Sequence, residues 1–172
     1  MIEEQVEIFH QSYPIGESLR KILLDESKKI DYDMSYKTNV QASMSSWKSA
    51  VDSPGVKMLE EWIFKYPLGQ YLNKGFKFVI NSAWFAKYSI GDNTINHMHI
   101  PAVFSFVYFI QSPPGSSPLI FTTSKLEIKP EEGKLVMFPS LLYHHVPHNK
   151  CDNRIVLAGN IFVIPSDYQK AT

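Results

Sequence analysis

The stretch "FKFVINSAWFAKYS", residues 76–89, is rich in β-branched and aromatic residues, as is typical of a β-strand. Similar stretches follow it, divided by the turn-forming segments "IGDN", "SPPGSSP" and "EEG". The further strands predicted in this way are residues 102–111, 118–124, 125–130, 134–140 and 154–164. Because no helical pattern separates them, we predict an antiparallel sandwich or barrel with helices packed outside.

The part of the chain before residue 76 has a helical pattern in two places. Within residues 15–30, one face of the expected helix carries Ile15, Leu19, Ile22 and Leu23. Ser53 and Pro54 are suited to the N-cap and first turn of a second helix, which Pro67 should end or bend. The apolar face of this second helix is Val56, Leu59, Trp62 and Ile63. We expect one domain over residues 1–172, with mostly helical support in 1–75 and a β-barrel core in 76–165.

Composition excludes several classes of protein. The 172 residues include 17 basic and 17 acidic side chains, so nothing favours a nucleic-acid surface, which needs a basic excess. The single cysteine rules out an internal disulfide framework. The acidic start "MIEEQVEIFHQSYP" lacks the features of a signal peptide, and the run 103–110 is too short to span a bilayer. We therefore expect a soluble protein of the cytoplasm without a membrane partner.

Five of the six histidines lie between residues 97 and 148. If His97 and His99 lie on one strand, their side chains share a face and could bind one metal ion. A third ligand could come from the second cluster, "HHVPH" at residues 144–148, which follows a predicted strand and a tight turn. The alternative is that these histidines are ordinary hydrogen-bonded residues at strand ends.

Arg154 begins the apolar strand "RIVLAGNIFV" and shares a face with Val156, Ala158 and Asn160. Burying an arginine is costly unless it is paired. One interpretation is an interior salt bridge with a glutamate. The other is a fork for the carboxylate of a ligand, which suits guanidinium geometry.

In combination, His97-Met98-His99, then "FPSLLYHHVPHN" at residues 138–149, then Arg154 resemble the iron(II)- and 2-oxoglutarate-dependent oxygenases. The pattern is most similar to a bacterial and phage branch that reads "HxHPxSxxSGVYY", "FPSxLxHxVxPN" and "RISxSFN". The resemblance covers roughly residues 76–163. It implies a double-stranded β-helix, a jelly-roll or cupin-like barrel, with supporting helices.

The resemblance also implies roles for individual residues. His97 and His144 match iron ligands, and Arg154 matches the arginine that holds the distal carboxylate of 2-oxoglutarate. Tyr88 matches a tyrosine that binds the same carboxylate in prolyl-hydroxylase-like relatives, although packing in the core is the alternative. Asn160 matches the asparagine that closes the last motif, and we group it with the residues of the 2-oxoglutarate site.

One position departs from most of the superfamily. A carboxylate usually stands two residues after the first histidine, and His99 occupies that place here, as in the branch with the His-x-His pattern. Replacing a carboxylate by imidazole makes the metal site more positive by one charge. Asp92 is the nearest acid that could substitute, although its place in "IGDN" favours a turn. We expect the metal ligands, which are also the catalytic residues, to be His97, His99 and His144.

The activity implied is that of a dioxygenase of the hydroxylase type that uses Fe(II), 2-oxoglutarate and O₂ to oxidise an unidentified substrate. The co-substrate is a small molecule; the sequence leaves the prime substrate and the oligomeric state open. If the gene belongs to a phage, the compartment is the cytoplasm of the host. One alternative is a cupin-type metal enzyme without 2-oxoglutarate, against which the absence of an acid in residues 100–111 counts. The other is a non-catalytic jelly-roll binding module.

Overall fold

Two antiparallel sheets and two helices make up the structure, a computed structural model that describes residues 7–10, 16–69 and 75–166. The helices are α1 (Gly16–Ser27) and α2 (Pro54–Lys65). The strands are β1 (Glu7–His10), β2 (Val40–Gln41), β3 (Ser43–Met44), β4 (Phe76–Tyr88), β5 (Asn93–His97), β6 (Phe104–Gln111), β7 (Leu119–Phe121), β8 (Glu127–Ile128), β9 (Lys134–Pro139), β10 (His144–Val146) and β11 (Arg154–Pro165).

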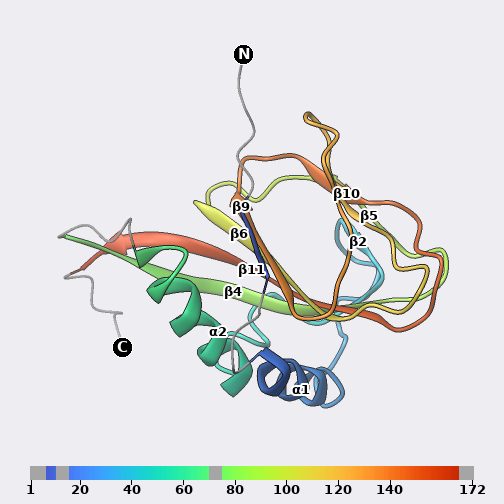
Figure 1. The fold of residues 1–172 in the computed structure, drawn as a ribbon, viewed down its shortest axis with the longest axis horizontal. Coiled ribbons are helices and arrows are strands. Elements are labelled where there is room, and N and C mark those ends of the chain that lie inside the picture. Colours follow the sequence, from blue (N-terminus) through green and yellow to red (C-terminus); the bar gives the residue numbers. More distant parts are fainter. Residues whose placement is uncertain (1–6, 11–15, 70–74, 167–172) are drawn as a thin grey trace.

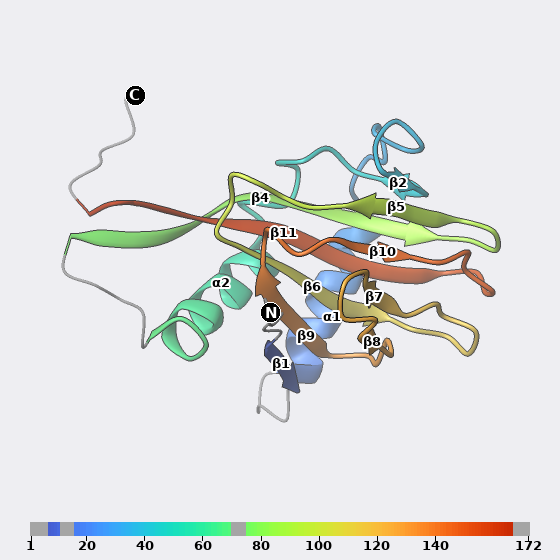
Figure 2. The ribbon, with the colours of Figure 1, turned by 90° about the horizontal axis from the view of Figure 1, so that it is seen from above.

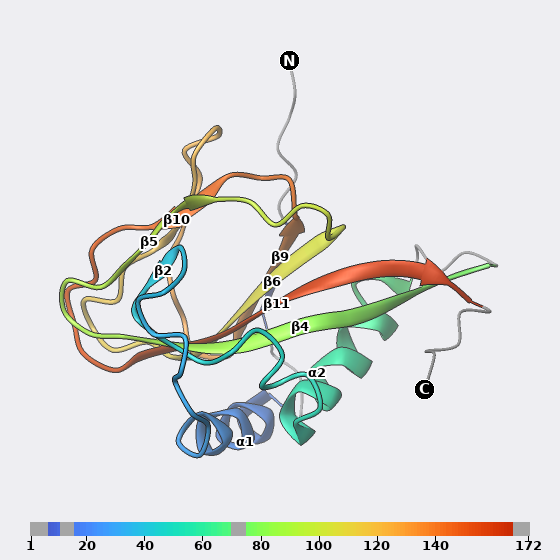
Figure 3. The same ribbon diagram turned by 180° about the vertical axis from the view of Figure 1, so that it is seen from behind.

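The two sheets face each other, and the helices cover the outer face of the larger one (Figure 1). The larger sheet has the order β1-β9-β6-β11-β4-β3, and the smaller has the order β2-β5-β10-β7-β8. Seen from behind, the strands β2, β5 and β10 lie over β4 and β11, with α1 and α2 on the opposite side (Figure 3). This is the mainly β architecture with external helices that the sequence predicts.

The larger sheet has an apolar core on each of its faces. The core against the helices contains Leu19, Leu23, Val56, Leu59, Ile63, Phe85, Leu135 and Leu157 among its buried members. The core between the two sheets contains Met44, Trp84, Tyr88, Phe109, Phe121, Phe138, Val146 and Val156 among its buried members. Because successive residues of a strand point to opposite faces, Val156 and Leu157 of β11 belong to different cores.

Both predicted helices are present. In α2 the hydroxyl of the N-cap residue Ser53 accepts a hydrogen bond from the Val56 N–H, and Pro54 occupies the first turn. In α1 the buried stripe contains Leu19 and Leu23, whereas Ile22 is only partly buried and Ile15 lies outside the described residues. Each helix has 12 residues, and neither is long and apolar enough to cross a membrane.

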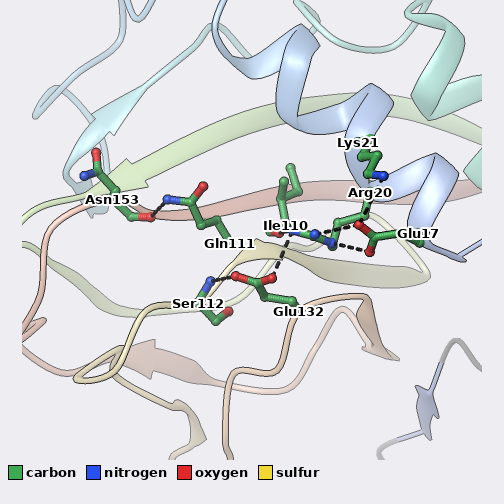
Figure 4. A network of polar contacts seen from close by, with 8 residues as sticks. All are labelled: Glu17, Arg20, Lys21, Ile110, Gln111, Ser112, Glu132 and Asn153. Carbon is green, nitrogen blue, oxygen red and sulfur yellow. Dashed lines mark hydrogen bonds and ion pairs between the residues drawn. The ribbon is translucent and has the colours of Figure 1, made fainter.

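A polar network fastens α1 to the larger sheet (Figure 4). Arg20 of α1 forms an ion pair of 2.9 Å with Glu132 and donates a hydrogen bond of 3.2 Å to the Ile110 carbonyl. The other oxygen of Glu132 accepts a hydrogen bond from the Ser112 N–H. Glu17, one turn before Arg20, forms an ion pair with it as well. These contacts fix the helix against β6 and the turn that follows it.

The strand predictions are confirmed for the long strands and incomplete for the short ones. The predicted strands 76–89, 102–111, 134–140 and 154–164 correspond to β4, β6, β9 and β11. The predicted strands 118–124 and 125–130 shorten to β7 and β8, and Lys125 between them has a φ of 62°. The strands β1, β2, β3, β5 and β10 were not predicted, because each has five residues or fewer and is too short for a period of two to appear.

The longest pair of strands, β4 and β11, runs beyond the rest of the sheet (Figure 2). Gly159 of β11 lies opposite Phe106 of β6. A Cβ atom at residue 159 would lie 2.5 Å from Cζ of Phe106 and 2.8 Å from the Ser82 carbonyl oxygen. Close approach of the Phe106 ring and of the β4 backbone therefore requires glycine here.

We expect Gly159→Ala to lower the free energy of unfolding by about 1–3 kcal/mol, as overpacking of a buried site does. Urea denaturation measures this change. The double variant Gly159→Ala/Phe106→Leu should recover part of the loss, because leucine is shorter than the ring. Equal stability of Gly159→Ala and the wild type would contradict the packing described here.

Candidate metal centre

Three histidines from two strands and one loop converge between the sheets. His97 ends β5 and His144 begins β10, and the two residues are direct partners in the antiparallel pairing. The prediction that His97 and His99 share a strand is wrong, because β5 ends at His97 and His99 lies in the loop that follows. The His99 N–H donates a hydrogen bond of 2.8 Å to the Ser140 carbonyl. The loop, not the pleat of a strand, therefore brings His99 to the other two.

The spacing of the imidazole nitrogens is that of ligands to one ion. One ligand nitrogen from each of His97, His99 and His144 lies within 4.8 Å of the other two. The Nε2 atoms of His97 and His99 are 3.1 Å apart. Two nitrogens bound at about 2.1 Å from a metal and at right angles are roughly 3.0 Å apart. The three nitrogens can therefore bind one metal ion from one side and leave the coordination positions on its other side for other ligands.

Hydrogen bonds fix the tautomer of two of the three rings. Nδ1 of His97 lies 2.8 Å from the Ile95 carbonyl, and Nδ1 of His144 lies 2.9 Å from the Leu142 carbonyl. Since a carbonyl only accepts, both Nδ1 atoms carry the proton, and both Nε2 atoms are unprotonated. In the contact of 3.1 Å between the two Nε2 atoms, His97 is therefore the acceptor and His99 the donor. A ligand histidine is commonly oriented in this way by a carbonyl behind it.

The environment keeps the three imidazoles neutral. Burial lowers the pKa of His144 to about 3, with a contribution from His97 nearby. Burial also lowers the pKa of His99 to about 3, with contributions from His97 and His144, and it lowers the pKa of His97. A neutral imidazole is the form that binds a metal, so the cluster needs no deprotonation near pH 7.

Arg154 lies in the same pocket and is 1% exposed. Its guanidinium stacks on Tyr88, 4.5 Å from the ring centroid, and lies 5.7 Å from the centroid of Phe109. Its Nε and Nη1 atoms have no hydrogen-bond partner. Within residues 7–10, 16–69 and 75–166, no carboxylate forms an ion pair with it, so the interior salt bridge to a glutamate is absent there. Burial accordingly lowers the pKa of Arg154.

Two hydroxyl groups lie in the pocket with Arg154. Tyr88 is the cross-strand partner of Arg154, and its hydroxyl is 2.7 Å from Oγ1 of Thr94 on β5. Both residues line the pocket and are buried. Thr94 could not be singled out from the sequence, because one threonine in a short polar stretch carries no signal before the pairing of the strands is known.

The part of the chain that the structure describes gives the pocket a mostly apolar lining without an acid. Besides the three histidines, Arg154, Tyr88 and Thr94, its lining includes Trp84, Phe106, Leu119, Phe138, Val146 and Val156. The rings of Phe138 and His144 lie edge to face with centroids 4.8 Å apart. Of the aromatic residues of β6, Phe106 lines the pocket, whereas Phe104 and Tyr108 pack in the core against the helices. Among the described residues that line this pocket, only Arg154 carries a formal charge, which is positive.

The remaining candidate residues lie elsewhere. Asp92 accepts hydrogen bonds from the Ser89 N–H and the Tyr36 hydroxyl, which is the expected turn role. His145 and His148 lie beside a shallow groove outside the histidine cluster.

Asn160 hydrogen-bonds to Ser82 and Ser105 and is not among the residues that line the pocket.

The loops that flank the histidines in the sequence carry exposed apolar side chains. His97 and His99 are partly exposed, whereas His144 and Arg154 are buried, so solvent reaches the pocket from the side of His97 and His99. The loops before His144 and after His97 carry exposed Met98, Ile100, Leu141 and Tyr143. Residues 98–103 and 139–143 contain no charged side chain. These two loops therefore have an apolar rim of exposed side chains without a charged residue.

Comparison with known proteins supports the fold. No family model matches the sequence, and no curated protein is matched by sequence. A viral collagen prolyl hydroxylase from Paramecium bursaria Chlorella virus-1, solved as a 2-oxoglutarate complex, has a TM-score of 0.69 at 14% identity and covers 91% of this chain and 94% of its own. A prolyl-4-hydroxylase from Pseudomonas putida has a TM-score of 0.66 at 16% identity, with 92% and 93% covered.

A third similar structure is a prolyl hydroxylase from Trichoplax adhaerens in complex with a peptide of the hypoxia-inducible factor oxygen degradation domain. It has a TM-score of 0.64 at 15% identity and covers 90% of this chain and 82% of its own. These three likenesses extend over nearly the whole chain at low identity. They show that the chain has the double-stranded β-helix fold of the 2-oxoglutarate oxygenases.

The lowered pKa values predict a pH dependence of stability without metal. The folded protein keeps His99 and His144 neutral down to about pH 3, whereas the unfolded chain takes up protons below about pH 6.5. The free energy of unfolding should therefore fall as the pH is lowered through 6.5. Urea denaturation in a chelator, from about pH 7.5 to about pH 5, measures this fall.

The control is the double variant His99→Gln/His144→Gln, which lacks both groups and should lose less stability over the same pH range. Parallel curves for the variant and the wild type would show that the two imidazoles are not buried in the neutral form.

Proposed function

We propose that this protein is an Fe(II)- and 2-oxoglutarate-dependent oxygenase that hydroxylates a substrate. The observation that carries this proposal is Arg154, a fully buried cation with two unpartnered nitrogens in the same pocket as three convergent histidines. Burying an unpaired charge costs several kcal/mol. A ligand carboxylate that accepts hydrogen bonds from Arg154 would remove this cost and explain why the arginine is there.

The donor atoms fit an iron site. His97, His99 and His144 would bind Fe(II) through nitrogen, which imidazole does readily for this metal. Three protein ligands on one face leave room for a co-substrate and for O₂. With the divalent ion and Arg154, the pocket would carry three positive charges and no acid. A dianion such as 2-oxoglutarate offsets two of them, so the charge of this pocket favours such a co-substrate.

Arg154 and its neighbours would bind the distal carboxylate of 2-oxoglutarate. The guanidinium offers a fork of donors, and its Nε and Nη1 atoms are free for this purpose. The hydroxyls of Tyr88 and Thr94 could reorganise their mutual hydrogen bond to donate to the same carboxylate. The apolar wall of Trp84 and Phe138 would exclude water from the bound keto acid.

When bound, iron and 2-oxoglutarate together supply the oxidising chemistry, in which decarboxylation to succinate and CO₂ is coupled to oxidation of the substrate. The chain itself would contribute the positions of the groups. The three imidazoles hold the metal, Arg154 sets the direction of the co-substrate, and the apolar rim admits the substrate from the side of His97 and His99. Because the single cysteine is free, we also propose that the enzyme acts in the reducing cytoplasm.

Arg154 also separates this proposal from its two alternatives. A cupin-type metal enzyme or a non-catalytic jelly-roll module gives no reason for a buried guanidinium beside the histidines. Conversion of 2-oxoglutarate to succinate by the purified chain, dependent on Fe(II) and O₂, tests the proposal. Iron-loaded protein that leaves 2-oxoglutarate unbound would favour the cupin-type enzyme, and failure to bind iron would favour the binding module.

We expect His97→Ala, His99→Ala and His144→Ala each to lose stoichiometric binding of Fe(II), because each removes one of three ligands. Asp92→Ala should keep it, since the Asp92 carboxylate serves a turn. Anaerobic dialysis followed by metal analysis measures the bound iron. If Asp92→Ala lost iron and His99→Ala kept it, the ligand set would have to be reassigned.

We expect Arg154→Leu to weaken binding of 2-oxoglutarate to the Fe(II) form by about 2–5 kcal/mol, the range for removing one partner of a buried charge pair. Without ligands the same variant should be at least as stable as the wild type, because it removes an unpaired buried cation. Anaerobic calorimetry measures the first effect and thermal unfolding the second. An unchanged dissociation constant would exclude Arg154 from the co-substrate site.

A further inference from the structure

A chain of hydrogen bonds leads from the middle of the larger sheet to the loop that carries His99. Its members are Ser82 on β4, Asn160 on β11, Ser105 on β6 and Ser140 after β9. Asn160 donates from Nδ2 to Oγ of Ser82 at 3.0 Å, and Ser105 donates from Oγ to Oδ1 of Asn160 at 2.9 Å. The hydroxyls of Ser105 and Ser140 are 2.7 Å apart.

The direction of the chain follows from counting protons. The Ser105 hydroxyl has one proton, and Asn160 receives it. Ser140 must therefore be the donor in its contact with Ser105. Ser105 is 1% exposed and Ser140 is 0% exposed, so neither hydroxyl can exchange its partner for bulk water. The side chain of Ser140 is thus held in one orientation by groups on three strands.

The main chain of Ser140 holds the loop of His99. Its carbonyl accepts a hydrogen bond of 2.8 Å from the His99 N–H, and its N–H donates one of 3.0 Å to the Val103 carbonyl. His97 and His144 lie on paired strands, and each ring is fixed by a carbonyl two residues before it. His99 lies off the strand, so the contact with Ser140 fixes the backbone from which its ring projects.

We propose that Asn160, Ser105 and Ser140 are positioning residues for the metal centre, which act on the ligand His99 through the Ser140 main chain. This inference rests on the proposed function, in which His99 is a ligand. It assigns to Asn160 a role behind the metal site in place of contact with 2-oxoglutarate. It also explains how an imidazole in a loop is held within ligand distance of two imidazoles on strands.

Cobalt(II) is a suitable probe, because its affinity is measured by competition with a chelator and its visible spectrum reports the geometry of the ligands. We expect Ser140→Ala and Asn160→Leu to weaken Co(II) binding about tenfold, the lower end of the effect of residues behind a metal ligand, and to shift the spectrum. Asn160→Asp should restore both, since a carboxylate accepts from the hydroxyls of Ser105 and Ser82.

Ser45→Ala is the matched control, because Ser45 is also 0% exposed and also hydrogen-bonded, to the Phe85 N–H and the Ser49 hydroxyl, away from His99. It should lower the melting temperature and leave the affinity and the spectrum unchanged. If Ser140→Ala and Asn160→Leu behave like Ser45→Ala, the positioning role is wrong. If the wild type binds no Co(II), or His99→Ala binds it equally well, the proposed metal centre itself fails.

Discussion

The rest of the site depends on a guanidinium that is buried between two sheets and has no carboxylate partner among the described residues. Stacking of Arg154 on Tyr88 offsets part of the cost, at about 0.5–2 kcal/mol for a cation over an aromatic ring. That is less than the several kcal/mol that an unpaired buried ion costs. The buried Arg154 therefore lowers the free energy of unfolding of the ligand-free protein. A site that binds an anion explains why the arginine is there.

His99 in place of a carboxylate changes the net charge of the metal site. In a pocket with a carboxylate ligand, iron, the acid and Arg154 would sum to two positive charges. With three neutral imidazoles the sum is three, so a dianionic co-substrate leaves a net charge of one instead of zero. We infer that a pocket of this charge favours binding of a dianionic co-substrate over binding of neutral ligands. We also infer that the oxidising strength of the bound metal differs from that in a site with a carboxylate ligand.

Much of the site could be predicted from the sequence, because its parts carry strong local signals. The histidines near a strand end, the arginine inside an apolar strand and the capped helix that begins at Pro54 are all recognisable without coordinates. The strand β5 was missed because "NTINH" is short and polar. Its end at His97, and therefore the position of His99 in the loop that follows, could not be predicted.

Residues whose roles depend on pairing between distant strands could not be predicted from the sequence. Thr94 belongs to the site because its hydroxyl hydrogen-bonds to that of Tyr88 on β4. Ser105 and Ser140 belong to it because their hydroxyls form a hydrogen-bonded chain to Asn160 on β11. Serine and threonine are common in strands and turns, so neither residue type points to a site until the register is known. A family resemblance alone made Asn160 a candidate residue, whereas its contacts with Ser82 and Ser105 suggest a physical role.

The most direct test of the central claim is an anaerobic titration of the purified protein with Fe(II) and then 2-oxoglutarate, followed by visible absorption. We expect a metal-to-ligand charge-transfer band that appears only when both are present and saturates at one equivalent of each. Stoichiometric binding of Fe(II) without such a band at saturating 2-oxoglutarate would contradict it.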